Sequence, residues 1–281
     1  MPGILQLVAT PIGNLDDITL RALRVLREAS VIAAEDTRRT AGLLAHFAIP
    51  TPLLSLHEHN EPARIAEVLD RIRRGERVAV VSDAGTPLLS DPGAHLVRAT
   101  LDAGLPVEAV PGASAVLAAL VVSGLNTDTF TFLGFPPARS ADRHRWLRAA
   151  GAEPRTIVFF EAPHRVRETL ADALTVLGDR EVAVTRELTK LHEEHLRGRL
   201  SAVLERLTDP RGEFTVVLAG PPCAEQPTPE LDDLAARKAF EELTAQGGLS
   251  RREAVAALAR RYGRPSREIY AAIERSKMSA D

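Results

Sequence analysis

The feature that most constrains the fold is an alternation, over residues 1–125, of short β-branched runs with longer amphipathic segments. This alternation is typical of βα units around a mostly parallel sheet. The runs lack a clean polar alternation, so we expect strands that are buried on both faces. The predicted strands are Ile4–Ala9, Val31–Ala34, Leu53–Leu56, Val78–Val81 and Val107–Val110. We predict helices over Thr19–Glu28 and through Ile65–Ile72, where apolar residues recur at helical spacing.

A diproline turn predicts the exit from this first α/β domain. The apolar run Phe130–Leu133 continues into Gly134-Phe135-Pro136-Pro137, and prolines stiffen a chain that leaves a strand. We therefore predict a first domain over 1–125, a hinge over 126–137 and a second α/β domain over 138–222. The second sheet is expected to be mixed, because Leu196–Leu200 resembles a hairpin strand. Its other predicted elements are the helices Ala141–Ala150 and Arg165–Leu177 and the strands Thr156–Phe160, Val182–Thr185 and Phe214–Leu218.

The carboxy-terminal segment predicts a small helical module with a basic surface. Residues 223–229 lack apolar periodicity and indicate a linker before the module, which we place at 230–281. A capping box at Ser250 and Glu253 predicts a helix start, and Gly263–Ser266 separates this helix from the next, as in a helix-turn-helix. Residues 249–277 carry a net charge of +5, whereas the whole chain carries −3. Any contact with nucleic acid therefore needs this local patch.

Turn-rich loops follow several predicted strands, and in an open α/β sheet ligands bind at the carboxyl ends of the strands. Residues 82–93 are longer and richer in turn formers than an ordinary βα loop, which favours a loop that binds a small molecule through main-chain atoms. Residues 111–114 begin a helix whose first amides suit a carboxylate, although a simple helix start explains them equally well. Residues 10–17 indicate a plain turn in which Asp17 caps the next helix.

Several classes of protein are excluded or disfavoured by what the sequence lacks. There is no Gly-x-Gly-x-x-Gly and no Gly-x4-Gly-Lys-Ser/Thr, which disfavours dinucleotide and P-loop phosphate sites. The single cysteine, Cys223, excludes an intramolecular disulfide and a multi-thiolate metal site, and it fits a reducing cytoplasm. No uncharged stretch reaches the roughly 18 residues of a membrane span, so we expect no membrane partner.

Five motifs, in order along the chain, resemble the bacterial ribosomal small-subunit methyltransferase I family of the tetrapyrrole-methylase-like superfamily. They are Val8–Leu15, Ala34–Arg38, Val81–Pro87, Val110–Ser114 and Phe160–Arg165. The resemblance implies two α/β domains with S-adenosylmethionine in the cleft between them, a homodimer, and a helix-turn-helix module at the carboxyl end. It also implies 2′-O-methylation of the ribose of cytidine 1402 in the decoding region of 16S rRNA.

The resemblance assigns cofactor contacts by motif position to Ile12, Asp83, Gly85, Thr86, Ser114, Ala115, Phe160 and Leu218. A ribose hydroxyl is a poor nucleophile, so a positioned general base is expected to contribute to catalysis. The candidates are Glu35, Asp36, Glu161 and Lys190, the lysine only where its surroundings lower its pKa. The residues expected to bind RNA phosphates are Arg38, His164, Arg165 and Arg186, with Arg251, Arg252, Arg260 and Arg264 on the helical module. No metal is expected.

Three alternatives stay open at this level. A porphyrinoid methyltransferase would share the cofactor and the architecture but has no obvious use for the basic module. A regulatory RNA-binding protein would use the α/β body as a scaffold without catalysis. A metal-dependent phosphoesterase would use His57, His59 and Asp83, although two histidines without a placed third ligand are more often surface groups.

Overall fold

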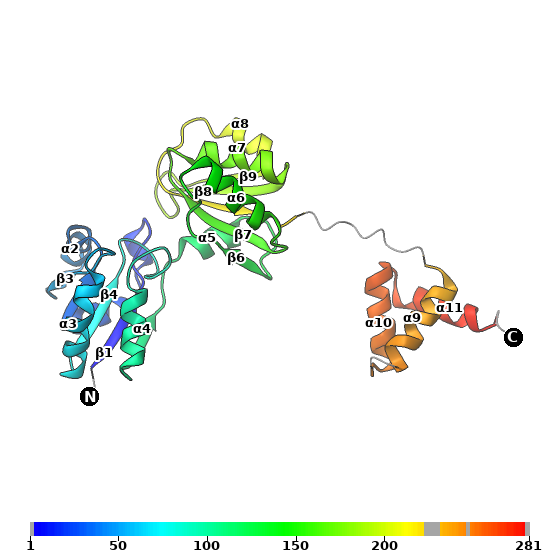
Figure 1. Ribbon diagram of the computed structural model, residues 1–281, viewed down its shortest axis with the longest axis horizontal. Helices are drawn as coiled ribbons and strands as arrows, with labels where there is room; N and C mark the ends of the chain where they lie inside the picture. Colours follow the sequence, from blue (N-terminus) through cyan, green and yellow to red (C-terminus); the bar gives the residue numbers. More distant parts are fainter. Residues whose placement is uncertain (1–2, 222–230, 246–247, 279–281) are drawn as a thin grey trace. The chain divides into compact units, whose positions relative to one another are not determined.

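The computed structural model describes residues 3–221, 231–245 and 248–278, and the chain divides into two compact units, Met1–Pro221 and Pro222–Asp281 (Figure 1). The predicted linker at 223–229, with Cys223, lies outside the described residues. The side chains of Arg260, Lys277 and Met278 also lie outside them. Within the first unit, the strands form two five-stranded sheets.

The first sheet confirms the predicted parallel arrangement. Its strands are β1 (Ile4–Val8), β2 (Val31–Ala34), β3 (Leu53–Ser55), β4 (Arg77–Val81) and β5 (Val107–Val110), in the order β3-β2-β4-β1-β5. All of the pairings are parallel. The inner strands are buried, but β3 and β5 are partly exposed, because each is an edge strand with a neighbour on one side only. The expectation of burial on both faces is therefore wrong for these two strands.

Helices cover both faces of this sheet. They are α1 (Leu20–Glu28), α2 (Thr37–His46), α3 (Glu61–Arg73) and α4 (Ala94–Asp102). One core combines β-sheet residues with side chains of α1 and α2, and a second core combines the opposite face with α3 and α4. Thr19, not Asp17, caps α1: its Oγ1 accepts a hydrogen bond from the amide of Ala22 at 3.0 Å. Asp17 ends a preceding 3-10 helix, η1 (Leu15–Asp17), and this places it too early in the chain to cap α1.

The second sheet is mixed, as predicted. Its strands are β6 (Phe130–Phe132), β7 (Thr156–Glu161), β8 (Glu181–Arg186), β9 (Glu194–Arg199) and β10 (Phe214–Leu218), in the order β6-β7-β10-β8-β9. Only β6 and β7 pair in parallel, and the β8–β9 hairpin confirms the predicted strand near Leu196. Helices α6 (Ser140–Gly151), α7 (Val166–Leu177) and α8 (Leu200–Arg206) share one core with this sheet.

Helix α5 (Ala115–Val122) packs against the other face of the second sheet. Its buried residues Val116, Ala119 and Leu120 share a core with Val158 and Val217. The chain therefore passes from the first sheet to the second within residues 111–114, earlier than the predicted hinge at 126–137. We call the first sheet with α1–α4 the first lobe, and the second sheet with α5–α8 the second lobe. The domain boundaries themselves stay a prediction.

The carboxy-terminal unit is built from α9 (Asp233–Ala245), α10 (Arg251–Tyr262) and α11 (Ser266–Met278). Its core includes Ala236, Leu258, Tyr262 and Ile269. The predicted capping box is present, because Glu253 Oε2 accepts hydrogen bonds from the amide and hydroxyl of Ser250 at 2.9 and 2.7 Å. In the part of the chain that the structure describes, no helix combines the length and apolarity needed to cross a membrane.

Candidate functional site

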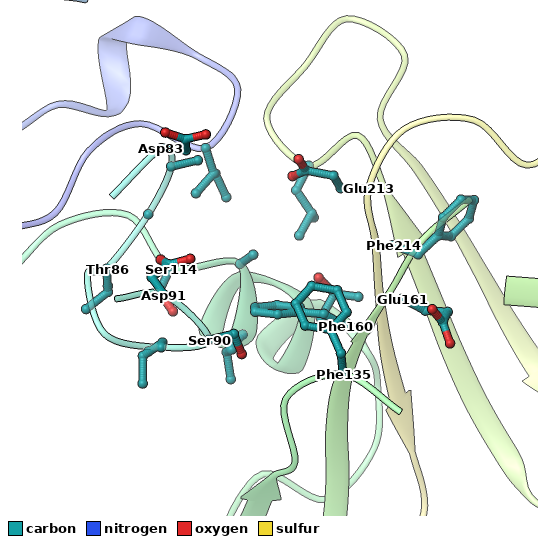
Figure 2. A pocket seen from close by; sticks show the side chains of 18 of the residues that line it. Asp83, Thr86, Ser90, Asp91, Ser114, Phe135, Phe160, Glu161, Glu213 and Phe214 are labelled. Atoms are coloured by element: carbon teal, nitrogen blue, oxygen red, sulfur yellow. The ribbon is translucent and has the colours of Figure 1, made fainter. Parts of the chain in front are cut away.

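A cavity of about 360 Å³ is lined by both lobes (Figure 2). Seven residues predicted to contact the cofactor line it: Ile12, Asp83, Gly85, Thr86, Ser114, Ala115 and Phe160. Three of the four base candidates line it too: Glu35, Glu161 and Lys190. The loops that carry these residues come from the carboxyl ends of β1, β2, β4, β5, β7 and β8, as the rule for α/β sheets predicts.

The 82–93 loop forms one wall of the cavity and is tied to its neighbours by hydrogen bonds. Thr10 and Gly85 exchange backbone hydrogen bonds at 2.9 and 3.0 Å, and Thr86 Oγ1 donates to the carbonyl of Ala113 at 3.2 Å. Gly85 has a φ of +76°, and a Cβ there would lie 3.2 Å from Ile12 Cγ2. Main-chain atoms thus approach the cavity without an intervening side chain, which suits the backbone-mediated binding that the loop composition predicts.

The two lobes approach each other closely at two glycines. A Cβ on Gly13 would lie 2.7 Å from the carbonyl oxygen of Leu188 and 2.5 Å from Lys190 Cγ. A Cβ on Gly134, at a φ of +66°, would lie 3.4 Å from Ser90 Oγ. Only glycine fits at Gly13 without displacing backbone, so this residue sets the separation of the lobes beside the cavity.

Carboxylates outnumber cations in the cavity wall. The first lobe contributes Glu35, Asp83 and Asp91, and the second lobe contributes Glu187 and Glu213. The cations are Arg39, whose Nη1 lies 3.3 Å from Asp83 Oδ2, and Lys190, whose Nζ lies 2.9 Å from Glu187 Oε1. The field in the cavity therefore favours a cationic ligand.

Two of these carboxyls are perturbed by their surroundings. Burial raises the pKa of Asp91, and the charges of Asp83 and Glu213 raise it further, against a hydrogen bond from Ser82 that lowers it. Burial also raises the pKa of Glu35, with added repulsion from Asp91 and Asp83. Each of these two carboxylates is destabilised relative to its protonated form, and a positive charge brought next to it would offset this effect.

Asp36 lies outside the cavity and has a structural role. Its Oδ1 accepts a hydrogen bond from the amide of Arg38 at 2.9 Å, which caps α2, and its Oδ2 lies 2.9 Å from Arg38 Nη2. The hydrogen bonds from Arg38 lower the pKa of Asp36 to about 2, so this carboxylate is a poor proton acceptor. The assignment of Asp36 as general base stays a prediction, which its role in the helix cap does not support.

Glu161 turns away from the cavity although its main chain lines it (Figure 2). The side chain is fully buried, and its oxygens accept hydrogen bonds from Arg165 Nε at 2.8 Å and from Thr169 Oγ1 at 2.6 Å. With its lone pairs engaged inside the second lobe, this carboxylate does not reach a ligand. The assignment of Glu161 as a base stays a prediction that this geometry does not support. Glu35 and Lys190 are the other base candidates that line the cavity.

Two of the predicted phosphate-binding arginines have internal partners. Arg165 binds Glu161 and donates through Nη2 to the carbonyl of Pro136 at 3.3 Å. Arg186 pairs through Nε with Glu194 at 2.6 Å and donates to the carbonyl of Asp209. Their phosphate contacts stay a prediction that these partners do not support, because both guanidinium groups bind within the second lobe.

The other predicted phosphate-binding residues are on the surface. Arg38 is exposed while it pairs with Asp36, and His164 is exposed next to the cavity residue Pro163. On the helical module the side chains of Arg251, Arg252 and Arg264 are exposed. That of Arg260 lies outside the described residues.

Leu218 does not line the cavity. Strand β10 runs antiparallel to β7 and β8, so its first residues, Phe214 and Thr215, reach the cavity, whereas Leu218 is buried at the opposite end. The cofactor contact of Leu218 stays a prediction that this placement does not support. The histidine pair of the phosphoesterase alternative, His57 and His59, is also absent from the lining, with ring centroids 6.0 Å apart. Over the residues described, no three His, Cys, Asp or Glu side chains form a potential metal site.

Sequence reasoning missed several lining residues. Asp91 lies in the 82–93 loop and Phe135 in the diproline turn, so both were within segments already singled out. Glu213 precedes β10 and was missed because the rule for parallel sheets points only to the carboxyl ends of strands. The available signal is the predicted hairpin strand, because it indicates a mixed sheet. In a mixed sheet the amino end of an antiparallel strand lies beside the carboxyl ends of its neighbours.

Comparison with known proteins places this architecture in a known class. The model of the family "Tetrapyrrole (Corrin/Porphyrin) Methylases" matches residues 5–204, and the chain belongs to this family. The uroporphyrin III C-methyl transferase of Thermus thermophilus has the same fold, with a TM-score of 0.55 and 24% identity over 77% of this chain and 97% of that one. The methyltransferase CobJ aligns with a TM-score of 0.59 and 22% identity over 78% and 94%.

Within the family the chain groups with the proteins named ribosomal RNA small subunit methyltransferase I. The relative from Synechocystis sp. is 46% identical, over 95% of this chain and 96% of its own length, and that from Bacillus subtilis is 43% identical over 95% and 93%. The relative from Thermotoga maritima is 50% identical over 78% of this chain and 99% of its own length, so part of this chain has no counterpart there. Membership confirms the predictions of a methyltransferase and of S-adenosylmethionine as its cofactor.

Proposed function

We propose that this protein methylates the RNA of the small ribosomal subunit, at the ribose 2′-oxygen of cytidine 1402 in the decoding region. The observation that carries the proposal is the carboxylate-rich cavity between the two lobes, in a chain that matches the small subunit methyltransferase I proteins along nearly their whole length. A porphyrinoid substrate is the second candidate, and the basic residues of the carboxy-terminal unit favour RNA over it.

The cavity fits the cofactor in size and charge. Its volume of about 360 Å³ lies in the range of small-molecule sites, and its surplus of carboxylates suits a ligand with a sulfonium and an ammonium group. The main chain at Gly85, Thr86, Ser114 and Ala115 would bind it, with Asp83 beside them and Phe160 on the opposite wall. The cofactor, when bound, supplies an electrophilic methyl group.

The protein's own contribution to transfer is to position the hydroxyl and accept its proton. Glu35 lines the cavity, and its raised pKa shows a carboxylate that binds a proton more readily than an exposed one. Lys190 also lines the cavity, but its Nζ is engaged by Glu187 Oε1 at 2.9 Å. We propose Glu35 as the general base, with the Glu35→Gln variant expected to lower kcat about 100-fold while cofactor binding persists.

RNA binding is proposed to involve surface residues on both compact units. Arg38 and His164 are the exposed candidates on the first unit. On the helical module Arg251, Arg252 and Arg264 are exposed, and Arg264 lies 3.9 Å from Glu268, too far for a tight ion pair. Arg251, Arg252 and Arg264 can therefore neutralise phosphates without first breaking a tight ion pair with another described residue, whereas Arg38 is paired with Asp36.

A cytoplasmic homodimer is proposed as the working form. The location follows from the ribosomal substrate. The dimer is supported by α5, whose residues Leu117 and Val121 remain 53% and 72% exposed although the helix is apolar on all sides. Analytical ultracentrifugation of the wild type and of Val121→Glu tests it, and a monomeric wild type would contradict it.

Labelling of ribosomal RNA tests the proposed function. The purified protein is incubated with methyl-labelled S-adenosylmethionine and small subunits that lack the modification, and the labelled nucleoside is identified after digestion. We expect label in 2′-O-methylcytidine from the decoding region. Label on a base, or transfer to uroporphyrinogen in place of RNA, would contradict the proposal, and the Glu35→Gln variant serves as the inactive control.

A further inference from the structure

Phe135 lines the cavity and takes no part in the proposed cofactor binding or proton transfer. Its side chain is 53% exposed although it lines the cavity. The neighbouring Phe160 is less exposed, because it packs against the apolar core that includes α5. We infer that Phe135 is the platform on which the base of the substrate nucleotide stacks. This inference rests on the proposed RNA substrate and deepens it, because it identifies how the target nucleotide is positioned.

The main chain and the aromatic neighbours of Phe135 fix where its ring lies. The amide of Leu133 donates to the carbonyl of Val158 and the amide of Phe160 donates to the carbonyl of Gly134, each at 2.9 Å, so the segment continues the pairing of β6 with β7. The ring centroid of Phe135 lies 5.5 Å from that of Phe160, with the planes tilted by 54°. Figure 2 shows the two rings together at the second-lobe side of the cavity. Part of the Phe135 ring is thus supported and part is open.

Buried charges make this segment rigid. Arg165 donates to the carbonyl of Pro136, the residue after Phe135, and is itself bound by the buried Glu161. Glu161 is further held by Thr169 Oγ1 at 2.6 Å. The ring is therefore presented on a backbone that needs little further ordering when a ligand arrives, and this lowers the entropic cost of binding. The network explains why Glu161, a cavity-lining residue, turns its charge inward toward Arg165.

The chemistry of the proposed reaction requires such a platform. A ribose hydroxyl that enters the cavity brings its own base to the rim, and extruding a nucleotide from its stack costs a few kcal/mol. Stacking on an aromatic side chain offsets part of this cost and is worth about 1–3 kcal/mol per base. The cofactor is expected on the other side, along the main chain at Gly85, Thr86 and Ser114, where Figure 2 shows the first-lobe loop. A base is thus the occupant that the exposed ring can accept.

The test compares Phe135→Ala and Phe135→Trp in the full-length protein with Leu101→Ala as a matched control. Leu101 is similarly exposed, at 56%, but lies on α4 and is absent from the cavity lining. We expect Phe135→Ala to raise the KM for small subunits roughly 5- to 150-fold, the range for loss of one base stack, with a smaller effect on kcat. Cofactor Kd, measured by calorimetry without RNA, should change less than about twofold.

Phe135→Trp is expected to keep the wild-type KM and to add a direct readout. The chain has a single tryptophan, Trp146, so the new indole emission is measured against the wild-type background. Addition of small subunits should quench it in the presence of S-adenosylhomocysteine, where no transfer occurs. If Phe135→Ala fails to fold, the quenching measured in Phe135→Trp tests the stacking by itself.

The possible results distinguish a failure of the stacking platform from a failure of the proposed function. A wild type that methylates rRNA while Phe135→Ala keeps its KM, or while Leu101→Ala loses as much, would refute the platform and leave the proposed function standing. A loss of cofactor affinity in Phe135→Ala without RNA would make the ring a cofactor wall and refute the platform as well. A wild type that transfers no methyl group to rRNA refutes the proposed function, and with it the platform.

Discussion

Asp91 carries a charge that the folded protein disfavours at neutral pH. Its pKa is raised by burial and by the neighbouring charges of Asp83 and Glu213, so the folded chain binds this proton more tightly than the unfolded chain does. Stability is therefore lost as pH rises from about the ordinary value of 3.8 through the folded pKa, and is regained on acidification through the same window. A cationic ligand next to Asp91 would offset this loss of stability.

The Asp91→Asn variant is expected to be more stable than the wild type at pH 7, since the amide has no charge to desolvate. The difference in Tm should vanish below pH 3.8, where the wild-type carboxyl is protonated in both states. Asp70→Asn is the control, because Asp70 is exposed on α3 and outside the cavity lining. Thermal unfolding across pH checks this, and equal shifts in the two variants would contradict it.

The same variant should discriminate between cofactor and product. We expect Asp91→Asn to lower the affinity for the positively charged S-adenosylmethionine by about fivefold, which is about 1 kcal/mol, and that for the neutral S-adenosylhomocysteine much less. Calorimetric titration with both compounds measures the difference. Equal losses for the two ligands would show that Asp91 acts on shape and not on charge.

Glu161 shows how a residue in a recognisable motif can serve the fold. Its fully buried carboxylate compensates Arg165, so Glu161→Gln leaves an arginine without its charge partner. We expect a loss of about 3 kcal/mol in the free energy of unfolding, measured by denaturant titration. A variant that unfolds like the wild type and binds cofactor but transfers no methyl group would instead restore Glu161 as the base.

At the scale of elements, the sequence predicts most of the strands, but it does not predict in every case which elements pack against each other. The β-branched runs of β2, β5 and β10 were found with their bounds, because such residues favour extended backbone in a buried sheet. The assignment of α5 to a sheet was not predictable, since a helix that is apolar on every side has no polar face to show its orientation. The direction of β10 was not predictable either, because local pattern does not reveal whether a strand runs parallel or antiparallel to its neighbours.

The contact between the 10–17 loop and the 187–190 loop permits a test of this arrangement. Gly13→Ala would place a Cβ 2.7 Å from the carbonyl of Leu188, so the two loops must separate. We expect cofactor affinity to fall at least about tenfold, with the fold retained, by calorimetry and circular dichroism. Gly42→Ala on α2 is the matched control: a Cβ there has no neighbour within 4 Å, and it should add about 0.5–1 kcal/mol of stability. Unchanged affinity in Gly13→Ala would contradict a tight contact.

At the scale of the whole molecule, the positive charge is concentrated in one stretch of a carboxy-terminal unit that is neutral overall, because residues 222–281 hold ten basic and ten acidic side chains. Residues 249–277 carry +5 in a chain whose net charge is −3, so the remainder is acidic and gains little from a polyanion. The two compact units have separate cores, and the relative from Thermotoga maritima has no counterpart for part of this chain. We therefore expect removal of residues 222–281 to leave cofactor affinity unchanged while weakening binding to small subunits.

The salt dependence of RNA binding separates an electrostatic role of the module from a structural one. Each phosphate contact contributes about 0.7–0.9 to the slope of log K against log salt, so replacing Arg251, Arg252 and Arg264 by glutamine should reduce the slope by about 2 to 3. These side chains are exposed, and the core residues Ala236, Leu258 and Ile269 stay in place. A triple variant with full affinity and slope would show that the module binds no phosphates, and any effect of the truncation would then belong to contacts of another kind.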